Sequence, residues 1–444
     1  MYPRQKKPED FMDDLNRQAM EYHLGGKIKV CPSKPCASPL DISLAYTPGV
    51  AAVTLEIYNN PESAYSYTSK GNLVAVVSNG SAVLGLGNMG ALASKPVMEG
   101  KGLLFKRFAD IDVFDIELNT SDPEKIIQTV KLMEPTFGGI NLEDIKAPEC
   151  FEIEERLINE CGIPVFHDDQ HGTAVVCTAA LLNAAVILGK NLSDLKIVFN
   201  GAGAAGISCA AMFVEAGVAR ENIIMCDIDG VLYKGRSAIS IRQTPFASDT
   251  NKRTLAEAMA GADVFVGVSV ADCVTQDMVR SMSARPVVFA LANPNPEISY
   301  EDAVSSRDDI IAATGRSDSL NQINNLLCFP FIFRGALDVR ASRITGGMKM
   351  AAAKALALLA MEPVTPYIKN TYGRDFSFGS EYIVPKPLDP RVIEYVAAAV
   401  AKAACDEKIA AKPIDDWDWY RTFLRERMAK YWNNGGDLHS PVNL

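Results

Sequence analysis

The sequence lacks the features that would place this protein in a membrane or on nucleic acid. Across 444 residues no uninterrupted apolar run reaches the roughly 18–20 residues that cross a bilayer. The best candidate, Thr173–Leu188, is interrupted by Asn183 and is expected to be a buried helix. Lysine and arginine form no cluster, and the net charge is -10. We therefore expect neither a membrane nor nucleic acid among its partners.

Signals for export and for disulfide bonding are also scarce. The N-terminal segment carries Arg4, Lys6 and Lys7 but no apolar core, and the acidic residues that follow are atypical of a transit peptide. The ten cysteines are scattered, and the closest two, Cys31 and Cys36, fit neither a redox nor a zinc spacing. The sequence predicts a cytoplasmic protein with reduced thiols.

What the sequence does contain is a strand, a glycine-rich turn and a helix in the order of a dinucleotide-binding unit. The apolar run Leu195–Phe199 leads into a G-x-G-x-x-G turn whose residues include Gly201, Gly203, Ala204, Ala205 and Gly206. The glycines allow a tight turn, a close approach to a pyrophosphate and close packing of the following helix. Asp227 ends the next apolar run, where an acidic residue meets a ribose hydroxyl.

A second stretch, Gly85–Gly90, has the same glycine pattern. The apolar run before it, 73–78, is followed by Asn79-Gly80 and a further apolar run, and Asn-Gly between apolar runs is typical of a hairpin. A strand that leaves a hairpin is a poor start for a parallel crossover unit. We expect Gly85–Gly90 to form a tight turn that leads into a helix near the active site.

Apolar runs alternate with helical patterns along the chain, which is typical of an α/β protein. Strands are expected at 83–86, 113–117, 164–166, 264–268, 287–291 and 310–313, and an amphipathic helix at 9–22. We predict an N-terminal α/β domain with a helical arm at 1–165 and a doubly wound parallel-sheet (Rossmann-type) domain at 166–365. A C-terminal helical segment is predicted at 366–444.

Two pairs of adjacent carboxylates, Glu143-Asp144 and Asp168-Asp169, offer the oxygen donors that hard cations prefer. Magnesium or manganese fits such a set best. His167 and His171 leave zinc as an alternative, because a spacing of four places them on one helical face, although Gly172 favours a loop there. Each acidic pair could instead cap a helix.

Five longer motifs, taken in order, resemble those of malic enzymes with short, bacterial-type subunits. They are Ala45–Val50, Val83–Asn88, Lys95–Lys101, Pro135–Asp144 and Phe166–Thr173, within a resemblance that runs from about 46 to about 334. The resemblance implies a malate-binding domain followed by an NAD(P)-binding domain. It also implies oxidative decarboxylation of L-malate to pyruvate and CO₂ with reduction of NAD or NADP.

The resemblance also implies residue roles, carried over position by position. The implied metal ligands for Mg²⁺ or Mn²⁺ are Glu143, Asp144 and Asp169, with Asp168 beside them in a catalytic role. Asn293 and Asn325 would contact the substrate near the nicotinamide, so Asn293 would also adjoin the cofactor. One departure is that long-subunit members carry a substrate-binding arginine where this chain has Ala82, and Arg316 is a candidate substitute.

Tyr46 and Lys101 would form the acid-base pair. A lysine that is partly desolvated beside a cation can have its pKa lowered toward neutrality, so Lys101 would take the proton of the C2 hydroxyl. Tyr46 would protonate C3 of the enolate of pyruvate. The alternatives are a solvated helix lysine, with Lys95 as a rival for the role, and a core aromatic at Tyr46.

The sequence favours NAD, because Asp227 and Asp229 would repel a 2′-phosphate, but Lys234 and Arg236 lie close enough to leave NADP open. We expect a homodimer or higher homo-oligomer, in which Tyr46 serves its own site or a neighbour's. A metal-independent amino-acid dehydrogenase and a non-catalytic dinucleotide-sensing protein are the competing hypotheses.

Overall fold

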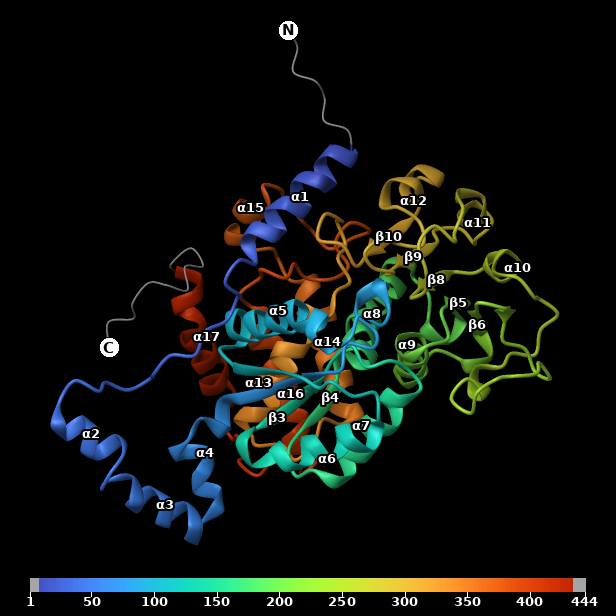
Figure 1. Cartoon of the computed structure of the whole chain (residues 1–444). Coiled ribbons are helices and arrows are strands. Elements are labelled where there is room, and N and C mark those ends of the chain that lie inside the picture. Colours follow the sequence, from blue (N-terminus) through green and yellow to red (C-terminus); the bar gives the residue numbers. More distant parts are fainter. Residues whose placement is uncertain (1–7, 434–444) are drawn as a thin grey trace.

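The computed structural model describes residues 8–433 and contains two sheets (Figure 1). The first lies within residues 73–167 and the second within 197–314, and we call these two parts the first and second halves of the chain. The first sheet has the order β2-β1-β3-β4, and all its pairs are parallel. Its strands are β1 (Leu73–Ser78), β2 (Asp112–Glu117), β3 (Gly139–Leu142) and β4 (Val165–His167). The helices between them are α5 (Ala91–Ala109), α6 (Pro123–Met133) and α7 (Glu149–Glu160). This half of the chain is a parallel α/β unit.

The expected hairpin at Asn79-Gly80 is wrong. β1 lies between two parallel neighbours, and the segment that was expected to return as a strand instead turns and forms the short 3-10 helix η3 (Leu84–Leu86). Asn79 and Ser81 are buried and bond to each other, which fixes the turn. The helix that was expected after this stretch is present, because Gly90 immediately precedes helix α5.

The second sheet has the order β10-β9-β8-β5-β6-β7. Its strands are β5 (Ile197–Asn200), β6 (Ile223–Asp227), β7 (Gly230–Val231), β8 (Val264–Gly267), β9 (Val287–Ala290) and β10 (Ile311–Thr314), with helices α9 (Ala204–Ala216), α10 (Leu255–Met259), α11 (Gln276–Arg280) and α12 (Tyr300–Ser306). Only the short edge strand β7 pairs antiparallel among the described strands. Strand order reverses beside β5, which is the arrangement of a doubly wound sheet. The predicted fold class is confirmed.

Helix α8 (Asp168–Leu188) leads from the first sheet to the second and is buried along most of its length. Asn183, the polar interruption in its apolar run, is itself buried and donates to the carbonyls of Ala357 and Ile383. By length and composition alone, α8 and the stretch 39–59 could cross a membrane. Two thirds of α8 is buried inside the protein, and 39–59 is divided into two helices.

The last third of the chain is helical and packs onto both halves. Its helices are α13 (Phe329–Asp338), α14 (Gly346–Met361), α15 (Pro366–Tyr372), α16 (Val392–Asp406) and α17 (Trp417–Asn433). α16 packs on α13 and α14, and α17 is fastened to the first half by the bond from Tyr431 to Asp110. The domain boundaries at 165 and 365 stay predictions.

An N-terminal arm precedes the first sheet, and its segment 39–59 stands away from the rest of the molecule (Figure 1). It comprises α1 (Pro8–Tyr22), α2 (Pro39–Ala45), α3 (Val50–Asn59) and α4 (Ala64–Tyr67). None of the residues of α2, α3 and α4 is buried, although Leu40, Leu44 and Leu55 are apolar. The predicted helix at 9–22 is present, but the side chain of Phe11 in its apolar stripe lies outside the described side chains.

Candidate active site

Three carboxylates converge at one edge of the first sheet. Glu143 and Asp144 follow β3, and Asp169 lies in the first turn of α8, which follows β4 directly. β3 and β4 are parallel neighbours, so their carboxyl ends meet at the same edge. One oxygen from each of the three residues lies within 4.8 Å of the others, and Asp169 also accepts the backbone N–H of Asp144 at 2.8 Å.

The triad combines burial, like charge and convergent oxygen donors. Burial raises the pKa of Glu143 to about 7 and that of Asp169 to about 6, and mutual repulsion between neighbouring carboxylates adds to both shifts. Asp144 has a positive φ of 52°, a strained conformation for a non-glycine residue that is often found at functional sites. Convergent oxygen donors of like charge suit Mg²⁺ or Mn²⁺.

Lys101 reaches the triad from α5. Its ammonium lies 2.9 Å from Glu143, forms a second, shorter ion pair with Asp168, and lies over the ring of Phe329. The residue is 8% exposed. Burial alone would lower the pKa of Lys101, but Asp168 and Glu143 raise it above the ordinary value. From the sequence, a lowered pKa was expected for Lys101. In the protein without a cation, the two carboxylates raise it instead.

Lys95, the rival on the same helix, lies elsewhere. It is half exposed and pairs with Asp115 of β2 at 2.5 Å and with Glu117 at 3.6 Å. Burial and the adjoining Asp115 raise the pKa of Glu117 to about 7. Lys95 thus belongs to a partly buried ion cluster on β2, whereas Lys101 belongs to the buried group with Glu143 and Asp168.

Gly172 leaves the room that Asp168 and Asn325 occupy. A Cβ atom placed on Gly172 would lie 1.9 Å from Oδ1 of Asp168 and 2.7 Å from Cβ of Asn325. Oδ1 of Asp168 is buried without a hydrogen-bond partner, while Oδ2 holds Lys101. Burial raises the pKa of Asp168 to about 7. Asn325, at the start of the short helix η8 (Asn325–Leu327), therefore lies beside the first turns of α8.

Asn293 lies across from the glycine turn of the first half. It follows β9, and its carbonyl oxygen would lie 1.9 Å from a Cβ on Gly85. Its side chain lies beside Gly315, which follows β10. The carboxyl end of the second sheet therefore faces the turn that leads into the Lys101 helix.

The two histidines do not form a zinc pair. α8 begins at Asp168, so the expectation of a loop before Gly172 is wrong. His171 pairs with Glu154 at 2.9 Å, while His167 is fully buried and burial lowers its pKa to about 4. Among residues 8–433, the group of three or more potential ligands that comes together is Glu143, Asp144 and Asp169.

Glu154 of α7 is a site residue that the sequence did not single out. Its carboxylate accepts the backbone N–H of His167 at 3.0 Å, the side chain of Gln170 at 3.1 Å and that of His171. The neighbouring His171 offsets the effect of burial and holds the pKa of Glu154 down at about 2. Glu154 thus fixes the junction from which Asp168 and Asp169 project. A single acid on an amphipathic helix gives no sequence signal for this role.

The glycine cradle has the geometry expected of it. Gly201 has a φ of +112°, and a Cβ there would lie 2.4 Å from the carbonyl of Val268. A Cβ on Gly206 would lie 1.9 Å from the carbonyl of Gly201, so α9 can approach β5 only without one. Gly203 is the N-cap residue of α9, and Ala204 and Ala205 lie in the first turn of the helix. The amide groups of this turn are suited to a pyrophosphate.

Asp227 ends β6 as expected, but it is already engaged. Both its oxygens accept from Arg236 at 2.8 Å, and the guanidinium also bonds to the carbonyls of Gly230 and Val231. Asp229 is exposed and lies 3.3 Å from the same guanidinium. Asp227 and Asp229, which were expected to repel a 2′-phosphate, therefore share the guanidinium of Arg236.

Tyr46 and Arg316, two residues expected at the active site, do not lie beside Lys101 and the carboxylates. Tyr46 is 72% exposed at the end of α2, on the arm that stands away from the sheets (Figure 1). Arg316 follows β10 and is held by Asp318 at 2.7 Å. All ten cysteines are free.

Comparison with known proteins supports the two-part layout. Residues 25–158 match the family model "Malic enzyme, N-terminal domain", and residues 170–368 match "Malic enzyme, NAD binding domain". An NADP-dependent malic enzyme of Salmonella typhimurium is 55% identical over 94% of this chain, which spans 56% of that relative. One from Halomonas elongata is 54% identical over 90% of this chain and 96% of its own.

A solved structure shares the fold. The crystal structure of malic enzyme from Pyrococcus horikoshii is 43% identical, covers 95% of this chain and 97% of its own, and superposes with a TM-score of 0.86. The chain spans about half the length of the first curated relatives that it matches.

Proposed function

Because this chain belongs to the malic enzyme family, we propose that it oxidises L-malate and decarboxylates it to pyruvate and CO₂ while reducing NAD(P). The observation that carries the proposal is the convergence of Glu143, Asp144 and Asp169 beside Lys101. Malate has an α-hydroxy acid that a cation can chelate and a β-carboxylate that can leave as CO₂, so this combination matches its chemistry.

The residues fit both a divalent cation and a dinucleotide. Glu143, Asp144 and Asp169 would hold the cation, since they are hard oxygen donors within 4.8 Å of one another. Gly201, Gly203, Gly206 and the first turn of α9 would hold the pyrophosphate. A cation held by these residues would supply Lewis-acid polarisation of the C2 oxygen and positive charge beside Lys101, and a bound nicotinamide would supply the hydride acceptor.

Lys101 is the proposed base for the C2 hydroxyl. Its ammonium already lies among the oxygen donors that would surround the substrate, and burial favours the neutral form once the surrounding negative charge is balanced. Asp168 holds the lysine through Oδ2, and its unpartnered Oδ1 is free to share a proton. We assign Asp168 the role of orienting Lys101 and passing its proton on. Asn293 and Asn325 are the proposed substrate contacts.

Tyr46 is the proposed acid, and we infer that it acts on the site of a second copy of the chain. No residue of α2, α3 or α4 in this arm is buried, and the apolar side chains of Leu40, Leu44 and Leu55 are exposed. A stable assembly would cover these three side chains. A homodimer or higher homo-oligomer that exchanges arms would bury these side chains and bring a phenol to each Lys101.

The cofactor is NAD(P), and the choice between the two forms is proposed to depend on Arg236. A carboxylate alone at Asp227 would favour NAD, as expected from the sequence. Because Arg236 binds both oxygens of Asp227, the repulsion of a 2′-phosphate is weakened and NADP is admitted. Removing Arg236 should shift the preference toward NAD.

The test is to follow absorbance at 340 nm with malate, Mn²⁺ and either NAD or NADP, and to identify the product. The proposal expects pyruvate and reduced cofactor in equal amounts and loss of activity on adding EDTA. Activity that survives EDTA would favour a metal-independent dehydrogenase. Dinucleotide binding without any malate-dependent reduction would favour a sensing protein.

A further inference from the structure

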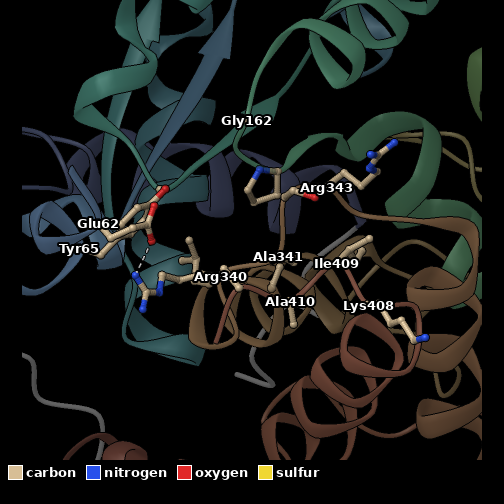
Figure 2. Close-up of a pocket in the computed structure, with 15 residues that line it drawn as sticks. Glu62, Tyr65, Gly162, Arg340, Ala341, Arg343, Lys408, Ile409 and Ala410 are labelled. Carbon is tan, nitrogen blue, oxygen red and sulfur yellow. Dashed lines mark hydrogen bonds and ion pairs between the residues drawn. The ribbon is translucent and has the colours of Figure 1, made fainter. Parts of the chain in front are cut away.

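The charged side chains that line a cavity of about 410 Å³ beside Gly138 do not converge. Arg340 turns to Glu62 at 2.8 Å, and the charged ends of Arg343 and Lys408 point away from the middle of the cavity (Figure 2). These charges therefore do not form a site for one ligand. The carboxyl ends of β8 and β9 differ, because a single buried carboxylate there gathers three hydrogen-bond donors.

That carboxylate belongs to Glu297, a fully buried acid between β9 and α12. Its Oε1 accepts the backbone N–H of Ser269 at 2.7 Å and the hydroxyl of Ser269 at 3.0 Å, and its Oε2 accepts the backbone N–H of Ala292 at 3.0 Å. A Cβ on Gly267, the last residue of β8, would lie 2.4 Å from the carboxyl carbon, so only glycine leaves room for the acid. Glu297 thus joins the ends of two parallel neighbouring strands.

Ser269 connects this acid to the dinucleotide cradle. Its hydroxyl also accepts from the side chain of Asn200 at 2.7 Å, and Asn200 ends β5 directly before Gly201. The carbonyl oxygen of Val268 would lie 2.4 Å from a Cβ on Gly201. The loop after β8 is therefore packed against the first glycine of the cradle.

Ala292 connects the same acid to Asn293, which follows it in the chain. The carbonyl oxygen of Asn293 lies against Gly85 of the first half, and its side chain lies beside Gly315. A shift of the Ala292 backbone would therefore move Asn293 relative to both halves of the chain.

We propose that Glu297 is a positioning residue that sets Asn293 relative to the dinucleotide cradle. The inference rests on the proposed function, in which Asn293 contacts malate. Because Glu297 is fully buried, it acts through the N–H of Ala292 and not on the substrate itself. A carboxylate suits this position because it offers acceptors only, and the three groups that bond to it are donors.

The substitution Glu297→Gln keeps the shape of the side chain and removes its charge. The single amide oxygen would stay with the two donors of Ser269, and the NH₂ group would oppose the N–H of Ala292. The end of β9 should then be released while the cradle keeps its contact. The matched control is Glu301→Gln, which removes the same charge from an exposed acid in the first turn of α12.

Steady-state kinetics with malate, Mn²⁺ and NADP separates positioning from folding. In Glu297→Gln the KM for malate should rise about tenfold, as expected from the loss of one hydrogen bond to a charged group, and NADP affinity should stay within about twofold. A merely structural role would lower kcat through a smaller folded fraction and leave the malate KM unchanged. Glu301→Gln should match the unaltered chain. An unchanged malate KM in folded Glu297→Gln protein would overturn the proposal.

Hydrogen exchange resolved to single amides tests the contact in the unaltered chain, whether or not the variant folds. The N–H of Ala292 should exchange slowly in the full chain without ligands. Exchange at the rate of an open loop would overturn the proposal. Slow exchange in a chain that shows no malate-dependent reduction of NADP would instead contradict the proposed function, and with it the role of Glu297 in placing Asn293.

Discussion

At Lys101 the chain holds one ammonium between two carboxylates in a site with little solvent. Glu143 lies 2.9 Å away and Asp168 forms the closer pair, so the lysine has a fixed position and a raised pKa. Such a group becomes a base only when the charge around it changes. The same carboxylates that orient Lys101 therefore make its basicity depend on a cation.

Replacing Lys101 with methionine should remove the base and leave the cradle intact. We expect kcat with malate to fall about 10²- to 10⁴-fold, the usual contribution of a positioned acid or base. NADP binding, measured by fluorescence titration, should be unchanged. Lys95→Met on the same helix is the control and should keep nearly full activity, since Lys95 pairs with Asp115. Equal losses in both variants would argue against a catalytic role.

The triad predicts that metal affinity rises with pH. The folded pKa values of Glu143 and Asp169, about 7 and about 6, lie above the unfolded values of about 4. The metal-free fold thus binds more protons than the unfolded chain in that window and loses stability as pH rises through it. Mn²⁺ needs the ionised form.

The Mn²⁺ association constant should therefore increase from pH 5.5 to 7.5 by about tenfold per pH unit for each proton released. Calorimetry in two buffers of different ionisation enthalpy measures both the affinity and the protons. An affinity independent of pH, with no proton release, would contradict the assignment of these carboxylates.

Among individual residues, the sequence indicated those whose type and spacing are typical of a metal or cofactor site. Adjacent acids after an apolar run indicated Glu143 and Asp169, and no comparable pattern marks Glu154. Glu154 acts through contacts that form only when α7 packs against the start of α8. The same holds for Arg236, whose distance in sequence from Asp227 suggested proximity but not a two-oxygen contact.

Among the elements, the part of the N-terminal arm that carries Tyr46 is exposed. α2 and α3 bury no residue, and Tyr46 lies between them on the surface. An apolar element of this kind gains stability when a second surface covers it. The arm is therefore proposed to complete the site of a neighbour.

Mixing two inactive variants tests this directly. If Tyr46 acts in a neighbouring subunit, co-expression of Tyr46→Phe with Lys101→Ala chains should yield mixed dimers in which one site has both groups intact. Random pairing would then restore about a quarter of the activity of the unaltered protein. If each chain supplies its own tyrosine and lysine, no mixture should recover activity.

The elements were predictable where the pattern was local and long. The strands of the second sheet and helix α8 follow from apolar runs, and the glycine cradle follows from its spacing. The hairpin at Asn79-Gly80 was wrong because the turn there is fixed by buried polar contacts, and β1 finds its partners far along the chain in β2 and β3. Strand pairing over that separation leaves no trace in the local sequence.

At the scale of the whole molecule, the carboxyl ends of the two sheets face one another. The glycine turn before α5 approaches the end of β9 so closely that Gly85 has no room for a Cβ against the carbonyl of Asn293. One sheet supplies the carboxylate triad, and the other supplies the cradle. The proposed reaction takes place where they meet.

Anomalous diffraction at the manganese edge, from crystals grown with Mn²⁺ and NADP, tests this arrangement most directly. The account predicts a manganese peak within coordination distance of Glu143, Asp144 and Asp169, with the nicotinamide end of the cofactor directed toward it. Well-ordered crystals with NADP in the cradle and no manganese between these three carboxylates would contradict it.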